Sequence, residues 1–244
     1  MRDAWLDLVL GSTCAGCGAP GRVLCDLCDA DLPRSAAVVW PTPCPAGLAR
    51  PVAAGEYDGL LKLLVNAHKE HRRFALARPL GVVLAHAVLA ALPESNADEW
   101  VLVPVPSRGS VVRSRGHDPM LRVTRRAAVL LRHWGHRVTM SPLLRTVGAP
   151  QDQTGLHAVE RAANLAGTMQ CRRAARPSRR PVRYLVTDDV ITTGATAREA
   201  QRALEDAGLP VSGVATVAAT RKRLRPPLLG SNSGASLPIS IFGD

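Results

Sequence analysis

Short apolar runs alternate with amphipathic segments between residues 52 and 217 of the chain. Apolar residues three and four positions apart predict helices, whereas uninterrupted apolar runs of four to eight residues predict buried strands. Asp58 and Pro79 mark two helix starts, because aspartate caps a first turn and proline fits within it. The pattern predicts strands at 52–57, 100–105, 137–140, 182–187 and 211–217, and helices from 58, from 79, at 119–134 and at 195–207.

Strands that alternate with helices predict an α/β domain, with a mostly parallel sheet covered by helices on both faces. Ligands of such sheets bind at the carboxyl ends of the strands. This rule indicates two loops as candidate sites, one after Val105 and one after Val186. The polar stretch 145–164 is expected to be partly helical, and the basic segment 171–180 is expected to be a loop.

The first fifty residues differ in composition from the rest of the chain. They contain five of the six cysteines and a proline-rich stretch near residues 41–45. A chain of 244 residues that is 46% hydrophobic can build one full domain and a small appendage. We therefore expect a small module with a Pro-rich linker at 1–50, a larger domain at 51–224 and a disordered tail at 225–244.

The charge balance is basic, with 31 Lys and Arg against 20 Asp and Glu. A net charge of +11 attracts polyanions, such as phosphorylated small molecules, nucleic acid or a membrane surface. An aromatic content of 3% argues against a platform for stacking single-stranded bases. No apolar run is long enough to span a bilayer, so we expect a cytoplasmic protein without membrane insertion.

The segment 184–196 is the most informative part of the sequence. An apolar strand is followed by two carboxylates, Asp188 and Asp189, and then by a loop of small residues that opens a helix. Backbone N–H groups at a helix start and threonine hydroxyls suit a phosphate, and a glycine lets the backbone approach it closely. The carboxylates suit sugar hydroxyls or magnesium. The candidate phosphate-binding residues are Thr192, Thr193, Gly194, Ala195 and Thr196.

An ordinary strand–turn–helix with a solvated acidic turn is the alternative interpretation of this segment. The paired acids next to a complete phosphate loop favour a phosphorylated ribose as the ligand. The segment is not a P-loop, because no Gly-Lys-Ser/Thr follows. It is not a dinucleotide fingerprint either, because the three spaced glycines are missing.

Two cysteine pairs, Cys14 with Cys17 and Cys25 with Cys28, have the spacing of zinc ligands. Four thiolates give a closed tetrahedral site, so the zinc is expected to be structural. Two redox pairs or plain buried thiols are the alternatives. Cysteines in a reducing compartment favour a metal site over disulfides.

Together these features resemble a known family. Segment 188–196 resembles the phosphoribosyl-pyrophosphate signature of type I phosphoribosyltransferases. The chain from Cys14 to about Arg221 resembles the ComF family of phosphoribosyltransferase-like proteins, which are named for competence for DNA uptake. The resemblance is carried by the two cysteine pairs, 57–59, Lys69, 103–106, 113–116, Gln153, Arg161, Asn164 and 188–196.

The resemblance implies a type I phosphoribosyltransferase-like domain after a small zinc-binding module. By position, Asp188 and Asp189 would hold ribose hydroxyls with magnesium nearby, and residues 192–196 would hold the 5′-phosphate. Lys69 is a further candidate, although a solvated helix end explains its basic surroundings equally well.

The resemblance also assigns the loop that follows the second predicted strand. Pro106, Ser107 and Arg108 match the pyrophosphate loop, and Arg113 and Arg115 lie where a mobile catalytic loop would supply positive charge. The chain departs from the family at 117–119, where His-Asp-Pro replaces Phe-Asn-Gln. Any role of that Asn or Gln is therefore not carried over.

Two functions follow as expectations. The first is binding of phosphoribosyl pyrophosphate or a nucleotide with magnesium, which leaves open a transfer of ribosyl phosphate to an unknown acceptor, as in a glycosyltransferase. The second is a non-catalytic competence factor that assists single-stranded DNA uptake, with DNA and DNA-uptake proteins as partners. The basic run at 172–180 is a solvated loop or a place of unspecific nucleic-acid contact.

Overall fold

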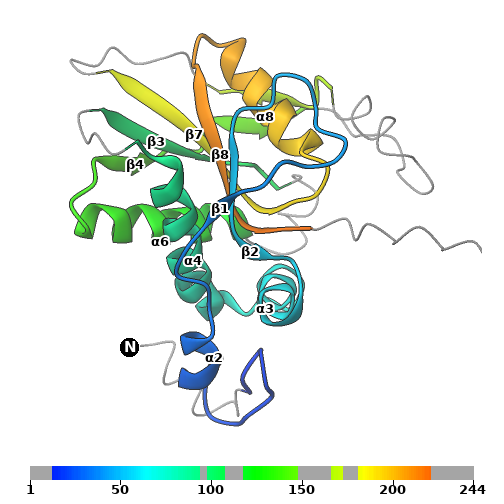
Figure 1. Ribbon diagram of the computed structural model, residues 1–244, viewed down its shortest axis with the longest axis vertical. Coiled ribbons are helices and arrows are strands. Elements are labelled where there is room, and N and C mark those ends of the chain that lie inside the picture. Colours follow the sequence, from blue (N-terminus) through cyan, green and yellow to red (C-terminus); the bar gives the residue numbers. More distant parts are fainter. Residues whose placement is uncertain (1–12, 94–97, 108–117, 148–165, 173–180, 221–244) are drawn as a thin grey trace, which may run out of the picture.

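The structure is a computed structural model that describes residues 13–93, 98–107, 118–147, 166–172 and 181–220 (Figure 1). It contains a mixed α/β domain with a mostly parallel sheet, and a four-cysteine cluster near the N-terminus. The expected tail at 225–244 and most of the basic run at 172–180 lie outside the described residues. The candidate residues Arg108, Arg113 and Arg115 lie outside them as well.

A six-stranded sheet forms the centre of the domain, in the order β1-β2-β8-β7-β3-β4. Neighbouring strands run parallel except β1 and β2, so the predicted mostly parallel sheet is confirmed. The strands are β1 (Ala37–Val38), β2 (Pro51–Glu56), β3 (Glu99–Pro104), β4 (Val138–Met140), β7 (Val182–Ile191) and β8 (Val211–Ala219).

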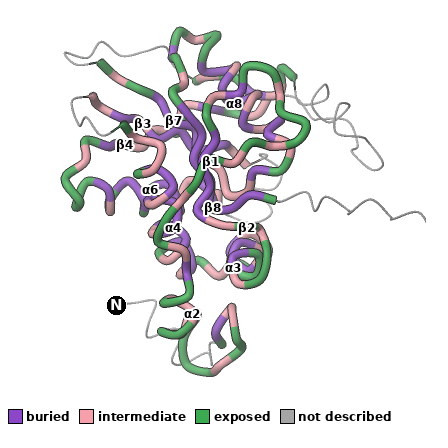
Figure 2. Tube along the Cα trace, viewed as in Figure 1, coloured by how far each residue is buried: buried purple, intermediate pink, exposed green. Residues whose placement is uncertain are grey.

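Helices cover both faces of this sheet. On one face, α4 (Ala77–Ala91) packs on β2 and β8, and α6 (Pro119–His133) packs on β3 and β4. On the other face, α8 (Ala195–Glu205) packs on β7 and β8. Side chains alternate between the two cores along each strand: Leu185 belongs to the α4 and α6 side, while Val186 belongs to the α8 side. Figure 2 shows these buried residues running along the central strands and α4.

Two helices begin where the sequence predicts, with an aspartate as the capping residue. The Asp58 carboxylate accepts the Gly59 N–H at 2.8 Å and starts α3 (Gly59–Glu70). The Asp118 carboxylate accepts the Leu121 N–H at 3.2 Å and starts α6, with a proline in the first turn. Capping of this kind satisfies backbone donors that the helix itself cannot satisfy.

The structure differs from the sequence-based prediction in the length of β7. The predicted strand ends at residue 187, but β7 continues to Ile191, because it stays paired with β8 up to Ile191 and Ala219. Asp188 and Asp189 therefore lie within the strand rather than in the loop that follows it. A long pairing partner overrides the low strand propensity of aspartate.

A two-stranded antiparallel sheet of β5 (Leu144–Thr146) and β6 (Met169–Cys171) is absent from the sequence-based prediction. Residues 145 and 146 are strand instead of helix, and residues 148–165 lie outside the described chain. The buried Glu199 of α8 holds β6 in place, since its carboxylate accepts the Met169 N–H at 2.9 Å. The guanidinium of Arg202 donates to the Met169 carbonyl, also at 2.9 Å.

One apolar stretch, Phe74–Ala91, is long enough by length and composition to cross a membrane. It comprises the short 3-10 helix η1 (Phe74–Leu76) and α4. Half of it is buried inside the protein, and Leu84 and Val88 have no exposed surface. Packing between the sheet and α6 accounts for its apolar character, as expected for the core helix of an α/β domain.

Candidate functional site

β3 and β7 lie side by side at the centre of the sheet, and the connections that follow them lead to opposite sides of this pair. The chain leaves β3 through α6 toward β4, and it leaves β7 through α8 toward β8. These two helices cover opposite faces, so the connections diverge and leave a crevice between the strand ends. A crevice of this kind is the usual ligand site of an open parallel sheet. Both loops that the sequence indicates open at this crevice.

The loop after β7 forms one wall of the site. Beyond Ile191 come Thr192 and Thr193, and then Gly194, whose φ of 73° is left-handed. No side chain caps α8 at Gly194, and the Ala195 N–H makes only a long contact of 3.4 Å with the Thr193 hydroxyl. The first-turn N–H groups of α8 therefore form a potential anion site, with the positive end of the helix dipole behind them.

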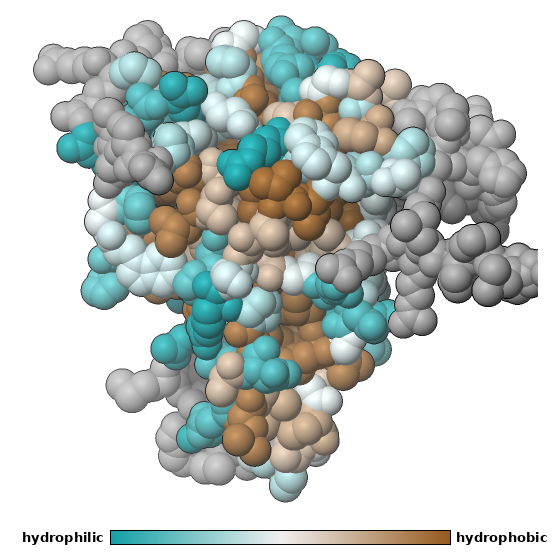
Figure 3. Space-filling model, viewed as in Figure 1, coloured by the Kyte–Doolittle hydropathy of each residue, from teal (hydrophilic) through white to brown (hydrophobic). Residues whose placement is uncertain are grey.

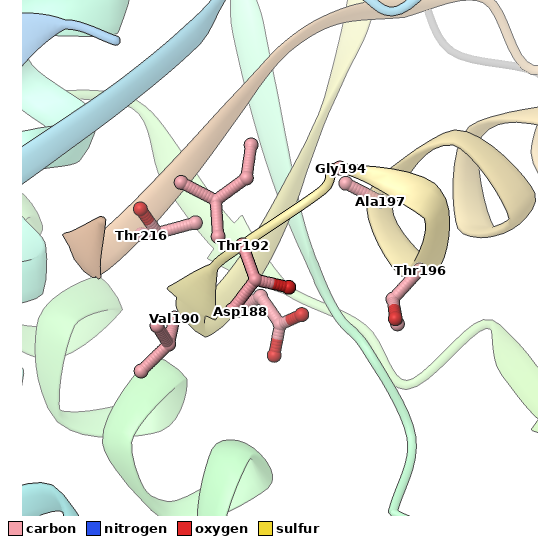
Figure 4. Close-up of a pocket in the computed structure, with 8 residues that line it drawn as sticks. Asp188, Val190, Thr192, Gly194, Thr196, Ala197 and Thr216 are labelled. Carbon is pink, nitrogen blue, oxygen red and sulfur yellow. The ribbon is translucent and has the colours of Figure 1, made fainter. Parts of the chain in front are cut away.

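A small open pocket lies beside this helix start (Figure 4). In the close-up, Asp188, Thr192 and Thr196 project toward the same open space from the strand, the loop and the helix. The pocket thus combines a carboxylate with hydroxyl groups and backbone N–H groups. Its lining residues are Asp188, Val190, Ile191, Thr192, Gly194, Thr196, Ala197 and Thr216.

The linker between the cysteine module and β2 supports this wall from behind. A Cβ atom on Gly194 would lie 3.0 Å from Leu48 and 3.1 Å from Pro41, so a larger residue would crowd the linker as well as strain the left-handed backbone. Two α8 side chains hold the linker, because Arg198 donates to the Ala46 carbonyl at 3.0 Å and Gln201 donates to the Gly47 carbonyl at 2.9 Å. Sequence reasoning missed this contact, since a Pro-rich linker carries no signal for its distant partner.

The two carboxylates of β7 have different partners. Asp189 forms an ion pair with Lys69 at the end of α3, with 2.5 Å between the carboxylate oxygen and Nζ. Asp188 accepts the backbone N–H of Asp189 at 2.9 Å. The strand is anchored just before them, because the buried hydroxyls of Thr187 and of Thr124 in α6 share a hydrogen bond of 2.9 Å. The structure thus places Lys69 at the candidate site and not on a free helix end.

The surroundings of the site shift the pKa of Asp188 and the pKa of Lys69. Burial and the adjacent charge of Asp189 raise the pKa of Asp188 to about 8, although Lys69 opposes the shift. Burial alone would lower the pKa of Lys69, but the charge of Asp189 raises it overall. The surroundings thus favour the protonated form of Asp188 and the charged form of Lys69. A bound cation or a set of hydroxyl donors would favour the ionised form of Asp188.

The loop after β3 forms the opposite edge of the crevice. The Val105 N–H donates to the Thr187 carbonyl at 2.9 Å, which ties this loop to β7. Pro106 follows, and both the N–H and the hydroxyl of Ser107 lie 3.3 Å from the carboxylate of Asp118. Asp118 lies in the stretch 117–119, where the sequence differs from the family that it resembles, and it caps α6 and holds the start of the loop.

The four cysteines form a second site, remote from the pocket. The sulfur atoms of Cys14, Cys17, Cys25 and Cys28 lie within 4.8 Å of one another, and those of Cys17 and Cys25 are 3.6 Å apart. Four sulfurs around one tetrahedral zinc ion are about 3.8 Å apart, given Zn–S bonds of about 2.3 Å. The cluster can hold a metal ion and is consistent with structural zinc.

The surroundings of Cys14 favour a thiolate ligand. Burial would raise the pKa of its thiol, but backbone N–H groups of Cys17, Cys25 and Gly16 lower it to about 6. Burial together with the sulfurs of Cys25, Cys14 and Cys17 raises the pKa of Cys28 to about 12. A divalent cation is what allows all four crowded sulfurs to be thiolates at once. Cys44 and Cys171 stand outside this cluster.

No protein-family model matches the sequence, and no curated protein matches it. What the site binds must therefore follow from its own residues. Among the described residues, the structure brings together Lys69, the two β7 carboxylates, the loop 192–196 and the turn at Pro106 and Ser107.

Replacement of Cys17 by serine tests the metal site. We expect the purified wild type to contain about one zinc ion per chain. Cys17→Ser should lose that zinc and unfold at a lower urea concentration, because metal binding stabilises a module without a large core. Metal analysis and urea denaturation measure both effects. Cys44→Ser is the matched control and should keep zinc; a zinc-free wild type would contradict the prediction.

Replacement of Asp188 by asparagine tests the partly buried carboxyl group. An unfolded aspartate titrates near pH 4, whereas the pKa of Asp188 in the fold is about 8. Because the folded chain keeps a proton that the unfolded chain releases, this contribution to stability is lost as pH rises from about 4 to about 8. Urea denaturation should therefore show a smaller decrease of unfolding free energy over this window in Asp188→Asn than in the wild type. The exposed control Asp31→Asn should keep the wild-type slope; equal slopes for all three proteins would reject the idea.

Proposed function

We propose that this chain is a phosphoribosyltransferase-like protein that binds phosphoribosyl pyrophosphate, or the phosphate of a nucleotide, with magnesium. One observation carries the proposal: an uncapped helix start and the Asp188 carboxylate line the same pocket at the switch point of the sheet, next to the Asp189 carboxylate that pairs with Lys69. The helix start favours an anion, and the carboxylates favour hydroxyl donors or a cation. A phosphorylated sugar with a bound cation satisfies both demands in one ligand.

The roles of the residues follow from their positions. The loop 192–196 would receive the 5′-phosphate through backbone N–H groups and threonine hydroxyls. Asp188 and Asp189 would accept hydrogen bonds from the ribose hydroxyls, and Lys69 would balance their charge. Pro106 and Ser107 begin the loop that would face the pyrophosphate. Magnesium, when bound, neutralises charge on the pyrophosphate and makes it a better leaving group.

Transfer of the ribosyl phosphate is the reaction that such a site supports. An acceptor nitrogen donates an electron pair to the anomeric carbon and loses its proton, while the bond to pyrophosphate breaks and its electrons leave with the pyrophosphate. Positive charge develops on the ribose ring, where the carboxylates of β7 stabilise it. The contribution of Arg113 and Arg115 to the leaving group stays a prediction from the sequence.

The ComF family is the assignment that best accounts for the two sites together. A four-cysteine cluster precedes the candidate ligand site in the chain, which is the order of parts in that family. The type I phosphoribosyltransferase fold is likewise proposed, on the strength of the mostly parallel sheet and the loop between β7 and α8.

Calorimetry with phosphoribosyl pyrophosphate and magnesium tests this function. We expect the zinc-loaded wild type to bind with a dissociation constant on the order of micromolar. The variant Asp188→Asn/Asp189→Asn should lose this binding, because neither amide can replace a carboxylate toward the hydroxyls and the cation. The control Asp31→Asn/Asp206→Asn also removes two carboxylates, both outside the pocket, and should bind as the wild type does. Absence of binding to the wild type would refute the small-ligand function.

A second function, contact with single-stranded nucleic acid, is favoured by the exposed face of α6. Arginines recur along this face, and no described residue forms an ion pair with any of them, although Arg122 lies over the Phe74 ring and Arg132 donates to the Val138 carbonyl at 3.2 Å. Arg22 and Arg34, by contrast, both pair with acids. In the helix itself no Asp or Glu occurs. Such a face suits a phosphate backbone. The face comprises Arg122, Arg125, Arg126 and Arg132.

The salt dependence of DNA binding tests this second function. The logarithm of the affinity for a single-stranded oligonucleotide should fall linearly with the logarithm of salt concentration, and Arg125→Gln/Arg126→Gln should reduce the slope by about 1.4, at about 0.7 for each lost phosphate contact. Arg22→Gln/Arg34→Gln loses the same net charge from ion-paired positions and should keep the wild-type slope. Equal slopes for both variants would assign any binding to net charge alone.

A further inference from the structure

The turn that follows α3 connects this helix with the four-cysteine module and, through His68, with α6. Arg73 reaches the cysteine module, where its guanidinium donates to the carbonyl of Thr13 at 2.8 Å and to the Thr13 hydroxyl at 3.1 Å. Thr13 immediately precedes Cys14, one of the four clustered cysteines. The end of α3 is thereby tied to the chain that enters the metal site.

His68 connects the same turn to α6. Its ring is only 2% exposed, with Nδ1 at 3.2 Å from the Arg73 carbonyl and Nε2 at 3.5 Å from the Pro119 carbonyl. Pro119 follows Asp118, which holds Ser107 at the edge of the ligand crevice. One buried ring thus lies between the turn that contacts the module and the helix that borders the candidate site.

The backbone of this turn adopts an unfavourable conformation. Arg72 has a φ of 54°, the one positive φ recorded for a non-glycine residue in the described chain. Residues other than glycine enter the left-handed region at an energetic cost, and they stay there when surrounding contacts hold them. The left-handed residue reverses the chain, so that the Arg73 side chain meets the module while its carbonyl returns to His68.

The module also contacts the first turn of α3. A Cβ atom on Gly16 would lie 2.6 Å from Leu60 Cδ1 and 2.8 Å from the Cys28 sulfur, so the module packs tightly on this turn. Ala15 and Val23 pack against the main core together with Leu60. Hydrophobic side chains gather at this end of the molecule, over α3 and the module (Figure 3). Both ends of α3 are therefore fixed by the module.

Lys69 occupies the position that this arrangement controls. It follows His68 in α3, and its ammonium pairs with Asp189, the neighbour of the pocket residue Asp188. The Lys69 side chain is 33% exposed, so its immediate neighbours do not fully fix its direction. Whether its ammonium reaches Asp189 therefore depends on where the end of α3 lies.

We propose that Arg73 and His68 are positioning residues, through which the four-cysteine module fixes Lys69 against Asp189. The metal-bound module is then part of the ligand site although it contributes no atom to it. The effect on ligand affinity rests on the proposed function, whereas the effect on Lys69 does not. Coupling between two sites is reciprocal, so ligand binding would also stabilise the zinc-loaded module.

The reactivity of Lys69 toward limited acetylation tests the proposal without any ligand. The chain has three lysines, Lys62, Lys69 and Lys222, and Lys62 is exposed on the same helix as Lys69. The ratio of Lys69 to Lys62 labelling, read by peptide mass spectrometry on zinc-loaded full-length protein, is thus internally referenced. Arg73→Gln should raise this ratio by about fivefold, the lower range of coupling between sites. Arg73→Lys, which keeps one donor toward Thr13, should restore part of the protection.

Two further variants separate positioning from general damage. Arg78→Gln removes an exposed arginine of α4 and should leave the ratio unchanged. Thr13→Val removes the hydroxyl on the module side without touching α3, and should raise the ratio in the same direction as Arg73→Gln. An unchanged ratio in Arg73→Gln and Thr13→Val, with zinc retained, would overturn the proposal.

Calorimetry with phosphoribosyl pyrophosphate and magnesium completes the test. If the wild type binds the ligand, Arg73→Gln should bind it about fivefold more weakly; unchanged affinity would overturn the role of the module in the ligand site. If the wild type does not bind but Lys69 labelling rises in Arg73→Gln, the proposed function fails while the positioning of Lys69 stands.

Discussion

The parallel pairing of β3 with β7 is the constraint on which the candidate site depends. Their register runs from Glu99 opposite Val182 to Pro104 opposite Thr187, so β3 ends just before the two carboxylates of β7. Because α6 and α8 then depart over opposite faces, neither connection closes the space between the strand ends. This pairing brings three parts of the site close together: the carboxylates of β7, the uncapped start of α8 and the turn at Ser107. A slip of the register would separate the two loops even if each kept its local structure.

Much of the architecture was accessible from the sequence, because the relevant signals are local. Asp58 and Asp118 precede amphipathic runs and cap the helices that those runs form. The apolar runs at β3, β7 and β8 lack a polar face, as expected for strands covered on both sides. The loop between β7 and α8 was also recognisable, since a threonine-rich turn with one glycine between a strand and a helix is a contiguous pattern.

The features that the sequence did not reveal depend on distant partners. β7 runs past Thr187 because β8 offers it pairing up to Ala219. The linker forms the back of the site because Leu48 and Pro41 meet a glycine about 150 positions away along the chain. The ion pair between Lys69 and Asp189 likewise joins segments that no periodicity connects. Short strands such as β5 and β6 are equally hard to predict, because three residues carry too little pattern.

The pairing of β2 with β8 has a consequence for how the site comes into being. β2 is the first parallel strand of the chain and β8 is the last, with Val52 opposite Ala215. Nearly the whole domain must therefore be synthesised before β2 can pair with β8. Non-local parallel contacts of this kind slow folding and leave strand edges exposed in the meantime. The nascent chain thus carries its complete cysteine cluster long before it has a sheet, and the metal site can form well ahead of the pocket that it helps to organise.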